Sequence, residues 1–357
     1  MVSSIRRCAA AAAALFSYRA TAQTYTSCNP LSATCSADTA LGMAIDVDFT
    51  QGEVNSFTAS GTPTYGSDGV TFTVSKSGDA PQLTSVFYIM FGRVEFSLKA
   101  APGAGIVSSF VLQSDDLDEI DWEWLGADST EVQSNYFGKG QTTSYNRGQF
   151  HEMGDNQGGF VNYVLDWTSD RIIWEVDGTA VRTLTASDAE TNQYPQTPMQ
   201  VKFGSWSGGD SSNAEGTIEW ARGPTDYTQG PFSMSVKNLK VTDYSTGSHY
   251  SYGDTSGAWT SITSDGGQIN GNLGNADTLT TTAVASASSS TSTANVPAGI
   301  GGSSSSSSDS SSLPEGWVMT SEGKIVPSGS ATLRPVLPVV FISTLFAILA
   351  GGRMFWP

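Results

Sequence analysis

The sequence predicts an all-β fold, a sandwich of two antiparallel sheets in which one sheet bends to form a concave cleft. Short apolar or alternating runs recur between turn signals, whereas helical periodicity is scarce. Residues 23–275 provide about 250 residues between two atypical ends, enough for one large β domain with its own core. Many strands with turn signals are typical of a two-sheet sandwich, and an extended polymer fits a bent sheet.

The expected strands follow one another along this unit. They lie at 70–74, 93–98, 105–112, 118–124, 199–209, 217–220 and 233–239, where apolar residues alternate with polar ones or form short runs. The clearest hairpin joins 172–176 to 179–184. Its turn is Asp177-Gly178, a pair that supplies the positive φ angles a tight turn requires.

One strand carries an unusual pattern. In the run 118–124, which reads DEIDWEW, three carboxylates stand at every second position between large apolar residues. Successive side chains of a strand point to opposite faces, so Glu119, Asp121 and Glu123 share one face while the apolar residues anchor the other in a core. Like charges side by side raise one another's pKa and destabilise a fold. Such a cost is tolerated where the perturbed pKa is used, which indicates a catalytic site.

Two carboxyl groups in different protonation states are what glycoside chemistry requires. We interpret Glu119 as the nucleophile and Glu123 as the general acid and then base. Asp121 is expected to hydrogen-bond one carboxyl and to hold the negative charge that keeps a proton on Glu123. Both Glu side chains must lean together, because residues four apart lie ~13 Å apart along a strand and a retaining glycosidase needs about 5 to 5.5 Å. An acidic, calcium-binding or merely solvated strand is the alternative.

The segment 199–209 is expected to form a sugar-binding strand. Lys202, Gly204 and Trp206 fall on one face, where Gly204 leaves open floor for a sugar ring. Pyranose rings pack on aromatic faces, and Lys202 can donate hydrogen bonds to hydroxyls or to an acetamide carbonyl. A core position for Trp206 is the alternative.

The next expected strand, 217–220, alternates again. It should offer Thr217 and Glu219 to the same cleft, with Ile218 turned away from it. Large aromatic residues mostly serve packing, so core burial is expected for three other tryptophans, Trp167, Trp174 and Trp220.

Composition restricts the ligands and the chemistry. With His151, His249 and three Cys, the chain has too few of the usual ligands for zinc or haem, so neither a metal nor a cofactor is expected. Two His residues are also too few to favour a Ser-His-Asp site. A position of His151, beside Glu152, at the edge of the active site is left as an alternative. A formal net charge of −17 argues against nucleic acid or an anionic polysaccharide, whereas a neutral sugar polymer suffers no repulsion.

Residues 1–22 have the features of a secretory signal peptide. Two Arg residues precede the apolar run 8–16, and small residues at 20–22 offer a cleavage site. Cys8 would leave with this segment. In the oxidising secretory route, the remaining Cys28 and Cys35 favour a short-loop disulfide.

Residues 276–327 are rich in Ser, Thr, Gly and Ala and cannot bury a core. They are expected to form a disordered, O-glycosylated stalk, or a flexible linker without sugar. Residues 328–357 resemble a GPI-attachment signal, with small residues before an apolar tail, and a retained membrane span is the rival. The protein is therefore expected to be secreted and held at the outer face of the plasma membrane, or handed on to a cell wall.

The segment Glu119-Ile120-Asp121-Trp122-Glu123 matches the signature of glycoside hydrolase family 16. Residues 91–95, 106–110, 135–140 and 204–210 are similar to the fungal Crh transglycosylases of the cell wall. The resemblance covers most of the chain from Gln23 to about Tyr244, and the two ends also fit that family. It implies a concanavalin-like β-jelly-roll enzyme that cleaves chitin through a covalent glycosyl-enzyme and passes the chain to a β-glucan acceptor.

The same resemblance implies roles for individual residues. Glu119 corresponds to the family nucleophile and Glu123 to its acid/base, and the cysteine pair matches a short N-terminal disulfide. Some members add a Cys-rich chitin-binding module, which the cysteines left here do not allow. The residues implied to contact chitin are Glu123, Lys202, Trp206 and Thr217.

The same two carboxylates serve transfer and hydrolysis, so three functions stay open: a cross-linking transglycosylase, a plain β-glucan or chitin hydrolase of this fold, and a non-catalytic wall lectin. Aromatic platforms on the acceptor side favour transfer by positioning a sugar before water arrives. Candidates for such platforms are Tyr136, Phe137 and Phe150. The expected partners are chitin and β-glucan, and the protein is expected to be a monomer.

Overall fold

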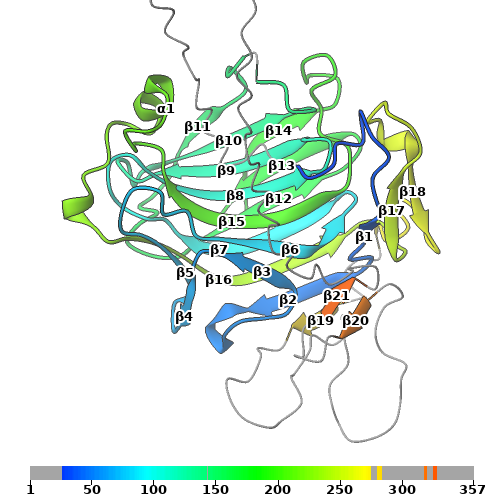
Figure 1. The fold of residues 1–357 in the computed structure, drawn as a ribbon, viewed down its shortest axis with the longest axis horizontal. Coiled ribbons are helices and arrows are strands. Elements are labelled where there is room, and N and C mark those ends of the chain that lie inside the picture. The colour runs from blue at the N-terminus through cyan, green and yellow to red at the C-terminus, as the bar shows by residue number, and fades with distance from the viewer. Residues whose placement is uncertain (1–25, 143, 275–279, 284–316, 320–324, 328–357) are drawn as a thin grey trace, which may run out of the picture.

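A computed structural model describes residues 26–142, 144–274, 280–283, 317–319 and 325–327. Two large sheets lie against each other and enclose the core (Figure 1). All pairs of neighbouring strands in both are antiparallel, apart from one parallel pair in the second sheet. The prediction of an all-β sandwich is therefore confirmed.

The first sheet, called the cleft sheet below, has seven strands in the order β11-β10-β9-β8-β15-β6-β3. Its strands are β3 (Phe57–Ser60), β6 (Gln82–Ile89), β8 (Ile106–Ser114), β9 (Glu119–Leu125), β10 (Glu131–Phe137), β11 (Gln149–Glu152) and β15 (Met199–Ser207).

The second sheet, called the outer sheet, runs in the order β14-β13-β12-β7-β16-β2-β19, with β5 paired to β16 and β4 to β5. Its strands are β2 (Ala44–Asp48), β4 (Thr64–Gly66), β5 (Gly69–Val74), β7 (Gly92–Lys99), β12 (Val161–Trp167), β13 (Arg171–Val176), β14 (Thr179–Thr185), β16 (Phe232–Asp243) and β19 (Thr280–Ala283).

Smaller elements complete the described chain. A three-stranded sheet and a two-stranded one stand beside the sandwich, together with short helices. They are β1 (Asp38–Thr39), β17 (His249–Tyr252), β18 (Ile262–Asp265), β20 (Trp317–Met319), β21 (Ile325–Pro327), α1 (Glu215–Trp220) and the 3₁₀ turns η1 (Phe49–Gln51), η2 (Tyr227–Gln229) and η3 (Trp259–Ser261).

Most of the expected strands are present. The runs at 70–74, 93–98, 105–112, 118–124, 199–209 and 233–239 correspond to β5, β7, β8, β9, β15 and β16. The expected hairpin joins β13 to β14, and both turn residues have positive φ, 46° for Asp177 and 76° for Gly178. Local turn chemistry therefore fixes this connection, as the sequence indicates.

The strand expected at 217–220 is wrong, because these residues belong to α1. The carbonyl of Ala214 accepts hydrogen bonds from the amides of Thr217 and Ile218 at 2.9 and 3.2 Å. Four alternating residues are too few to separate a period of two from one of 3.6. After the helix, Ala221 is buried against Val107 and Leu125, a long-range contact that alternation does not reveal.

Strand pairing also continues past the expected end of the folded unit at 275. β19 pairs in parallel with β2, and β20 pairs with β21, so the expectation of a stalk without structure is not met at these strands. The rest of 276–327, the signal peptide expected at 1–22 and the anchor signal at 328–357 lie outside the described residues. In the described part, no helix is both long and apolar enough to cross a membrane.

Aromatic side chains join the two large sheets. Phe96 of β7 stacks on Phe110 of β8 with ring centroids 4.5 Å apart and meets Phe203 of β15 edge-on at 5.1 Å. Trp122 and Trp124 of β9 contact Tyr163 of β12 at 5.7 and 4.7 Å. The apolar side of β9 is thereby fixed in the core, so its alternate side chains must point out of the sandwich. The tryptophans expected in the core at 167 and 174 are fully buried there.

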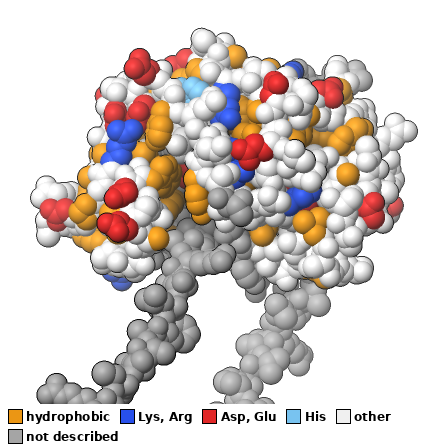
Figure 2. All heavy atoms as spheres, turned by 90° about the horizontal axis from the view of Figure 1, so that it is seen from above, with side chains coloured by type: hydrophobic (Ala, Val, Ile, Leu, Met, Phe, Trp, Pro, Cys, Tyr) orange, Lys and Arg blue, Asp and Glu red, His pale blue; other side chains and the backbone are white. Residues whose placement is uncertain are grey.

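The acidic surface charge is not gathered in one place on the face seen in Figure 2. Asp and Glu side chains stand at several separate points of that face, with Lys and Arg between them. A neutral polymer would meet no continuous field of one sign there.

We expect Phe96→Ala to lower the free energy of unfolding by about 3–5 kcal/mol, because it leaves a cavity between the sheets where four other aromatic rings contact Phe96. Urea unfolding followed by tryptophan fluorescence measures the change. The control is Leu273→Ala, whose side chain is 53% exposed. A loss below about 1 kcal/mol for Phe96→Ala would contradict this account of the core.

Candidate active site

Strand β9 presents its three carboxylates on the cleft side of the sheet and almost removes them from water. Glu119, Asp121 and Glu123 are 3%, 1% and 5% exposed. The strand lies between β8 and β10, so Glu119 stands opposite Gln113 and Phe137. The expectation that the acidic trio occupies one face, away from the tryptophans, is confirmed.

Burial raises the pKa of all three carboxyl groups. The pKa of Glu119 rises to about 7, and a hydrogen bond with Asp121 limits that rise. The pKa of Glu123 rises to about 8, because the charge of Glu119 adds to burial. The pKa of Asp121 rises well above its ordinary range through burial and the charges of both Glu residues. The buried trio therefore resists ionisation, and a proton is favoured on Asp121, which stands between the charges of both Glu residues.

The charge that keeps a proton on Glu123 differs from our expectation. We expected Asp121 to carry it, but the raised pKa of Asp121 makes that side chain a proton holder. The charge beside Glu123 is that of Glu119. Asp121 instead relieves repulsion, since a neutral carboxyl between two Glu residues adds no third negative charge.

Gln113 and Lys202 connect to the trio from neighbouring strands. Gln113 Nε2 donates to Glu119 Oε2 at 2.8 Å, and Lys202 Nζ donates to Gln113 Oε1 at 2.7 Å. Lys202 is thus linked to Glu119 through Gln113. Gln113 was missed by sequence reasoning. The strand expected from the sequence ends at residue 112, one short of Gln113, and the burial of Gln113 is visible only in the structure.

A cavity of about 450 Å³ opens beside the trio. Two tryptophans form one of its walls, with stacked rings 6.1 Å apart. They are Trp206 of β15, which donates to Ser109 Oγ at 3.3 Å, and Trp220 of α1, which donates to Gln133 Oε1 at 3.1 Å. The residues that line the cavity are Asp121, Glu123, Gln133, Asn135, Phe137, Tyr145, Gly148, Trp206, Ala214, Gly216, Thr217 and Trp220.

The helix changes which residues of 215–220 reach this cavity. Thr217 lines it as expected, and Trp220, three residues later, lies on the same side of the helix. The expected core position of Trp220 is therefore wrong, and so is the expected place of Glu219 in the cleft, since Glu219 is exposed and outside the lining. Trp206, by contrast, lies at the site.

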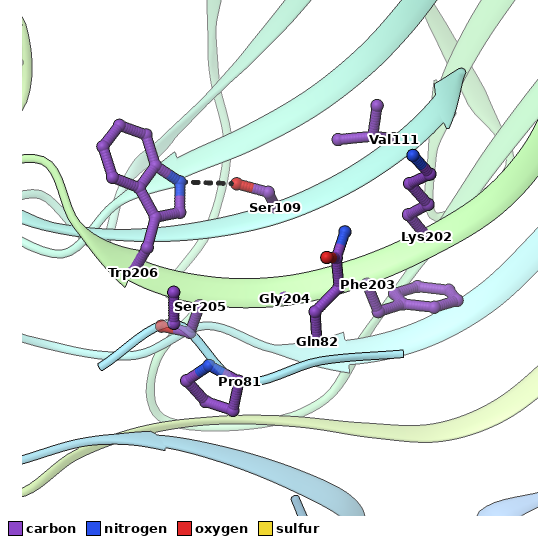
Figure 3. Close-up of a pocket in the computed structure, with 10 residues that line it drawn as sticks. Pro81, Gln82, Ser109, Val111, Lys202, Phe203, Gly204, Ser205 and Trp206 are labelled. Atoms are coloured by element: carbon purple, nitrogen blue, oxygen red, sulfur yellow. Dashed lines mark hydrogen bonds between the residues drawn. The ribbon is translucent and has the colours of Figure 1, made fainter. Parts of the chain in front are cut away.

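A second hollow lies across β8, β15 and β6 and shares Trp206 with the cavity beside the trio (Figure 3). Gln82, Lys202 and Trp206 rise on one side of the strands in this view, with Gly204 between them. A Cβ on Gly204 would sit 3.1 Å from the carbonyl oxygen of Pro81. Gly204 therefore keeps the floor low, as expected, and also lets β15 and the Pro81 backbone approach closely.

Comparison with known proteins assigns the chain to a family. Residues 49–222 match the model of glycosyl hydrolases family 16. Crh-like protein 4 of Botryotinia fuckeliana is 57% identical over 343 residues, which cover 91% of each chain. The chain belongs to glycoside hydrolase family 16. It is therefore a glycosidase or transglycosylase, and it is similar to the Crh-like members of the family.

Two further relatives of this family 16 chain support the same placement. Congo red hypersensitive protein 1 of Saccharomyces cerevisiae is 51% identical over 253 residues, covering 70% of this chain and 50% of that one. A solved structure of the Crh5 transglycosylase in complex with NAG is 48% identical and superposes with a TM-score of 0.65, covering 67% of this chain and 100% of that one. The β-jelly-roll expected from the resemblance is thus confirmed.

The aromatic candidates for the acceptor side of this family 16 site separate in the structure. Phe137 lines the cavity, whereas Tyr136 is buried on the core side, beside the Arg182 guanidinium. Phe150 is 42% exposed but outside the lining. Sequence reasoning missed Tyr145, which is 77% exposed, lines the cavity and meets Phe137 at 6.4 Å. Its place depends on a loop that no periodicity describes.

The remaining expectations concern His151, the cysteines and metals. His151 Nε2 lies 2.7 Å from Ser134 Oγ, and His151 is not among the cavity residues. Cys28 and Cys35 form the expected disulfide, with their Cα atoms 5.9 Å apart. Within the described ranges, no group of three or more His, Cys, Asp or Glu residues is arranged to hold a metal ion.

The raised pKa values predict that folding stability falls as pH rises. For Glu119 and Glu123 the folded values of about 7 and 8 exceed the ordinary 4.5, so their contribution is complete below pH 4.5 and is lost as pH passes 7 and 8. Glu123→Gln should therefore be more stable than wild type at pH 9, by about 1 kcal/mol or more, with the difference shrinking toward pH 5. Urea unfolding at each pH tests this.

The matched control for that series is Glu152→Gln, which makes the same change at an exposed position of β11. It should follow the wild-type pH dependence. Equal pH dependence of wild type and Glu123→Gln would contradict a buried carboxyl that resists ionisation.

Proposed function

We propose that this protein is a cell-wall transglycosylase that cleaves chitin by a retaining mechanism and transfers the cleaved chain to β-glucan or chitin acceptors, with hydrolysis as a side reaction. The observation that carries the proposal is the buried trio of β9, whose Glu residues both have raised pKa values beside an aromatic cavity. Membership in family 16 and the similarity to Crh-like proteins support it.

The first step transfers the sugar chain to the protein. Glu119 attacks the anomeric carbon, a bond forms between that carbon and a Glu119 oxygen, and the glycosidic bond breaks. Glu123 gives its proton to the leaving oxygen, so the fragment departs as an alcohol and Glu123 becomes a carboxylate. A protonated Glu123 near neutral pH fits this role, because its pKa of about 8 keeps the acid form available.

The second step releases the chain to an acceptor. A hydroxyl of the acceptor sugar gives its proton to Glu123 while its oxygen attacks the anomeric carbon, and the ester bond to Glu119 breaks. The anomeric configuration is then the same as at the start. If water takes the place of the acceptor, the same bonds break and hydrolysis results. The occupant of the acceptor side therefore decides the outcome.

Two sets of residues around the trio offer different contacts to a sugar chain. Lys202, Trp206 and Thr217, together with Glu123, are proposed to bind the chitin donor, and Lys202 can donate to an acetamide carbonyl. The solved relative in complex with NAG supports an N-acetylated donor, since chitin is built of that sugar. Phe137 and the exposed Tyr145 provide apolar faces on which an acceptor sugar can stack.

The proposed place of action is outside the cell. The N-terminal segment 1–22 and the C-terminal segment 328–357 have the features of a secretory signal and a GPI-attachment signal, and the Ser-rich stretch between the domain and the tail would serve as a stalk. The disulfide between Cys28 and Cys35 supports passage through an oxidising compartment. We propose that the enzyme acts there as a monomer.

Glu119→Gln should lose at least about a thousandfold in turnover, because the amide cannot form the glycosyl-enzyme. The assay incubates labelled chitin oligosaccharide with laminarin and follows the label into the glucan by chromatography. Glu152→Gln is the matched control and should keep wild-type turnover. Free sugar as the sole wild-type product would favour a plain hydrolase, and an unaltered biological effect of Glu119→Gln would favour a lectin.

Tyr145→Ala should lower the ratio of transfer to hydrolysis by about tenfold, because one aromatic platform contributes on the order of 1 kcal/mol to holding the acceptor. Both products are measured in the same reaction mixture at several acceptor concentrations. Leu273→Ala, at another exposed apolar position, should leave the ratio unchanged. Equal loss of both products in Tyr145→Ala would place Tyr145 outside the acceptor side.

A further inference from the structure

Gln113 joins the nucleophile to a cation two strands away. Its Nε2 donates to Glu119 Oε2 at 2.8 Å, and its Oε1 accepts from Lys202 Nζ at 2.7 Å. The three side chains come from β9, β8 and β15, which are neighbours in the cleft sheet. Gln113 is only 3% exposed, so water cannot readily replace either bond. We call this chain of hydrogen bonds the Lys202–Gln113 relay.

The relay has a fixed direction. An ammonium group can only donate hydrogen bonds, so Lys202 determines which end of the Gln113 amide faces it. The amino end of Gln113 must then face Glu119, and it also can only donate. Glu119 Oε2 therefore accepts this hydrogen bond. A donor fixed in this direction favours the carboxylate form of Glu119 over the protonated form.

The hydrogen bond with Asp121 also lowers the pKa of Glu119, and the relay adds to that effect against burial. Asp121 and Glu123 share its strand, and Asp115, which follows β8, acts on Lys202. Lys202 is the cation whose charge lowers the pKa of Glu119, against the effect of burial. None of the ion pairs found among the described residues includes Glu119. The positive charge reaches it through space and through Gln113.

We propose that Gln113 is a positioning residue that passes the influence of Lys202 to Glu119 and so keeps the nucleophile ionised and correctly rotated for attack. This inference rests on the proposed role of Glu119 as nucleophile. It adds a function for Lys202 beyond contact with the sugar. Gln113 itself acts through Glu119 and is not assigned a contact with the reacting atoms.

The loss of either member of the relay should act on Glu119 in the same direction, by a different route. Without the Gln113 amide, Glu119 loses its donor, and the proton shared among the buried carboxyls can move onto it. Without Lys202, the Gln113 amide can turn and present its oxygen to Glu119, which favours the protonated form. In both cases a larger fraction of Glu119 is protonated at a given pH, so the enzyme is inactive up to a higher pH.

The test compares pH profiles of kcat/KM for the full chain, with wild type, Gln113→Met, Lys202→Met and the double variant. We expect the acid limb of Gln113→Met to move upward by about 1 pH unit or more, with the loss in kcat rather than KM. Lys202→Met should move it in the same direction. The double variant should move it less than the sum of the two single shifts, because both act along one path.

Gln149→Met, the same substitution at an exposed position of β11, is the control and should keep the wild-type profile. A purely structural role for Gln113 would lower the whole profile and leave the limb in place, and a role in sugar contact would raise KM at every pH. Either result overturns the relay. If Gln113→Met does not fold, the limb of Lys202→Met decides, and an unmoved limb there overturns it as well.

A second measurement does not depend on turnover. Carbon-13 NMR titration of the carboxyl groups, with Glu119 assigned by comparison with Glu119→Gln, should show Glu119 ionising at higher pH in Gln113→Met than in wild type. An unchanged titration overturns the relay even if the enzyme is active. An inactive wild type with the shifted titration would instead contradict the proposed transglycosylase function and leave the relay standing.

Discussion

The burial of three carboxylates on one strand is the constraint on which the rest of the site depends. Taking ionised groups out of water is costly unless they are paired or neutralised, and no ion pair of the described residues reaches Glu119, Asp121 or Glu123. The carboxyl groups are stabilised by bound protons and by the hydrogen bond from the Gln113 amide instead of by direct contact with a cation. A salt bridge to the acid would hold it ionised and remove the proton it must give, so indirect compensation leaves the chemistry possible.

Packing on the opposite face of the same strand offsets the free-energy cost of burying the carboxylates. Trp122 and Trp124 are fully buried against the outer sheet, and the indole of Trp174 donates to the carbonyl of Asp121 at 3.1 Å. Backbone and core therefore hold β9 in place while its acidic side chains repel one another. Stability comes from one face and reactivity from the other, and the alternation of a single strand separates the two.

Local periodicity made most of this structure predictable. The strand period of two assigned the trio and the tryptophans of β9 to opposite faces, and Asp177-Gly178 located a hairpin, because neighbours in the chain determine both features. The failures needed distant contacts. Residues 217–220 are helical, next to the buried Ala221, and the helix directs Trp220 to the cavity. Gln113 lies opposite Glu119 because of the register between β8 and β9. Tyr145 depends on a loop whose path no pattern encodes.

The pairing of β19 with β2 sets how a tethered enzyme would face its surroundings. β19, the last described strand of the sandwich, ends at Ala283 and belongs to the outer sheet, whereas β9 belongs to the cleft sheet (Figure 1). A lipid attachment farther along the chain would therefore hold the molecule by its back. The carboxylates of β9 would then lie on the sheet away from the attached side, toward the wall polysaccharides.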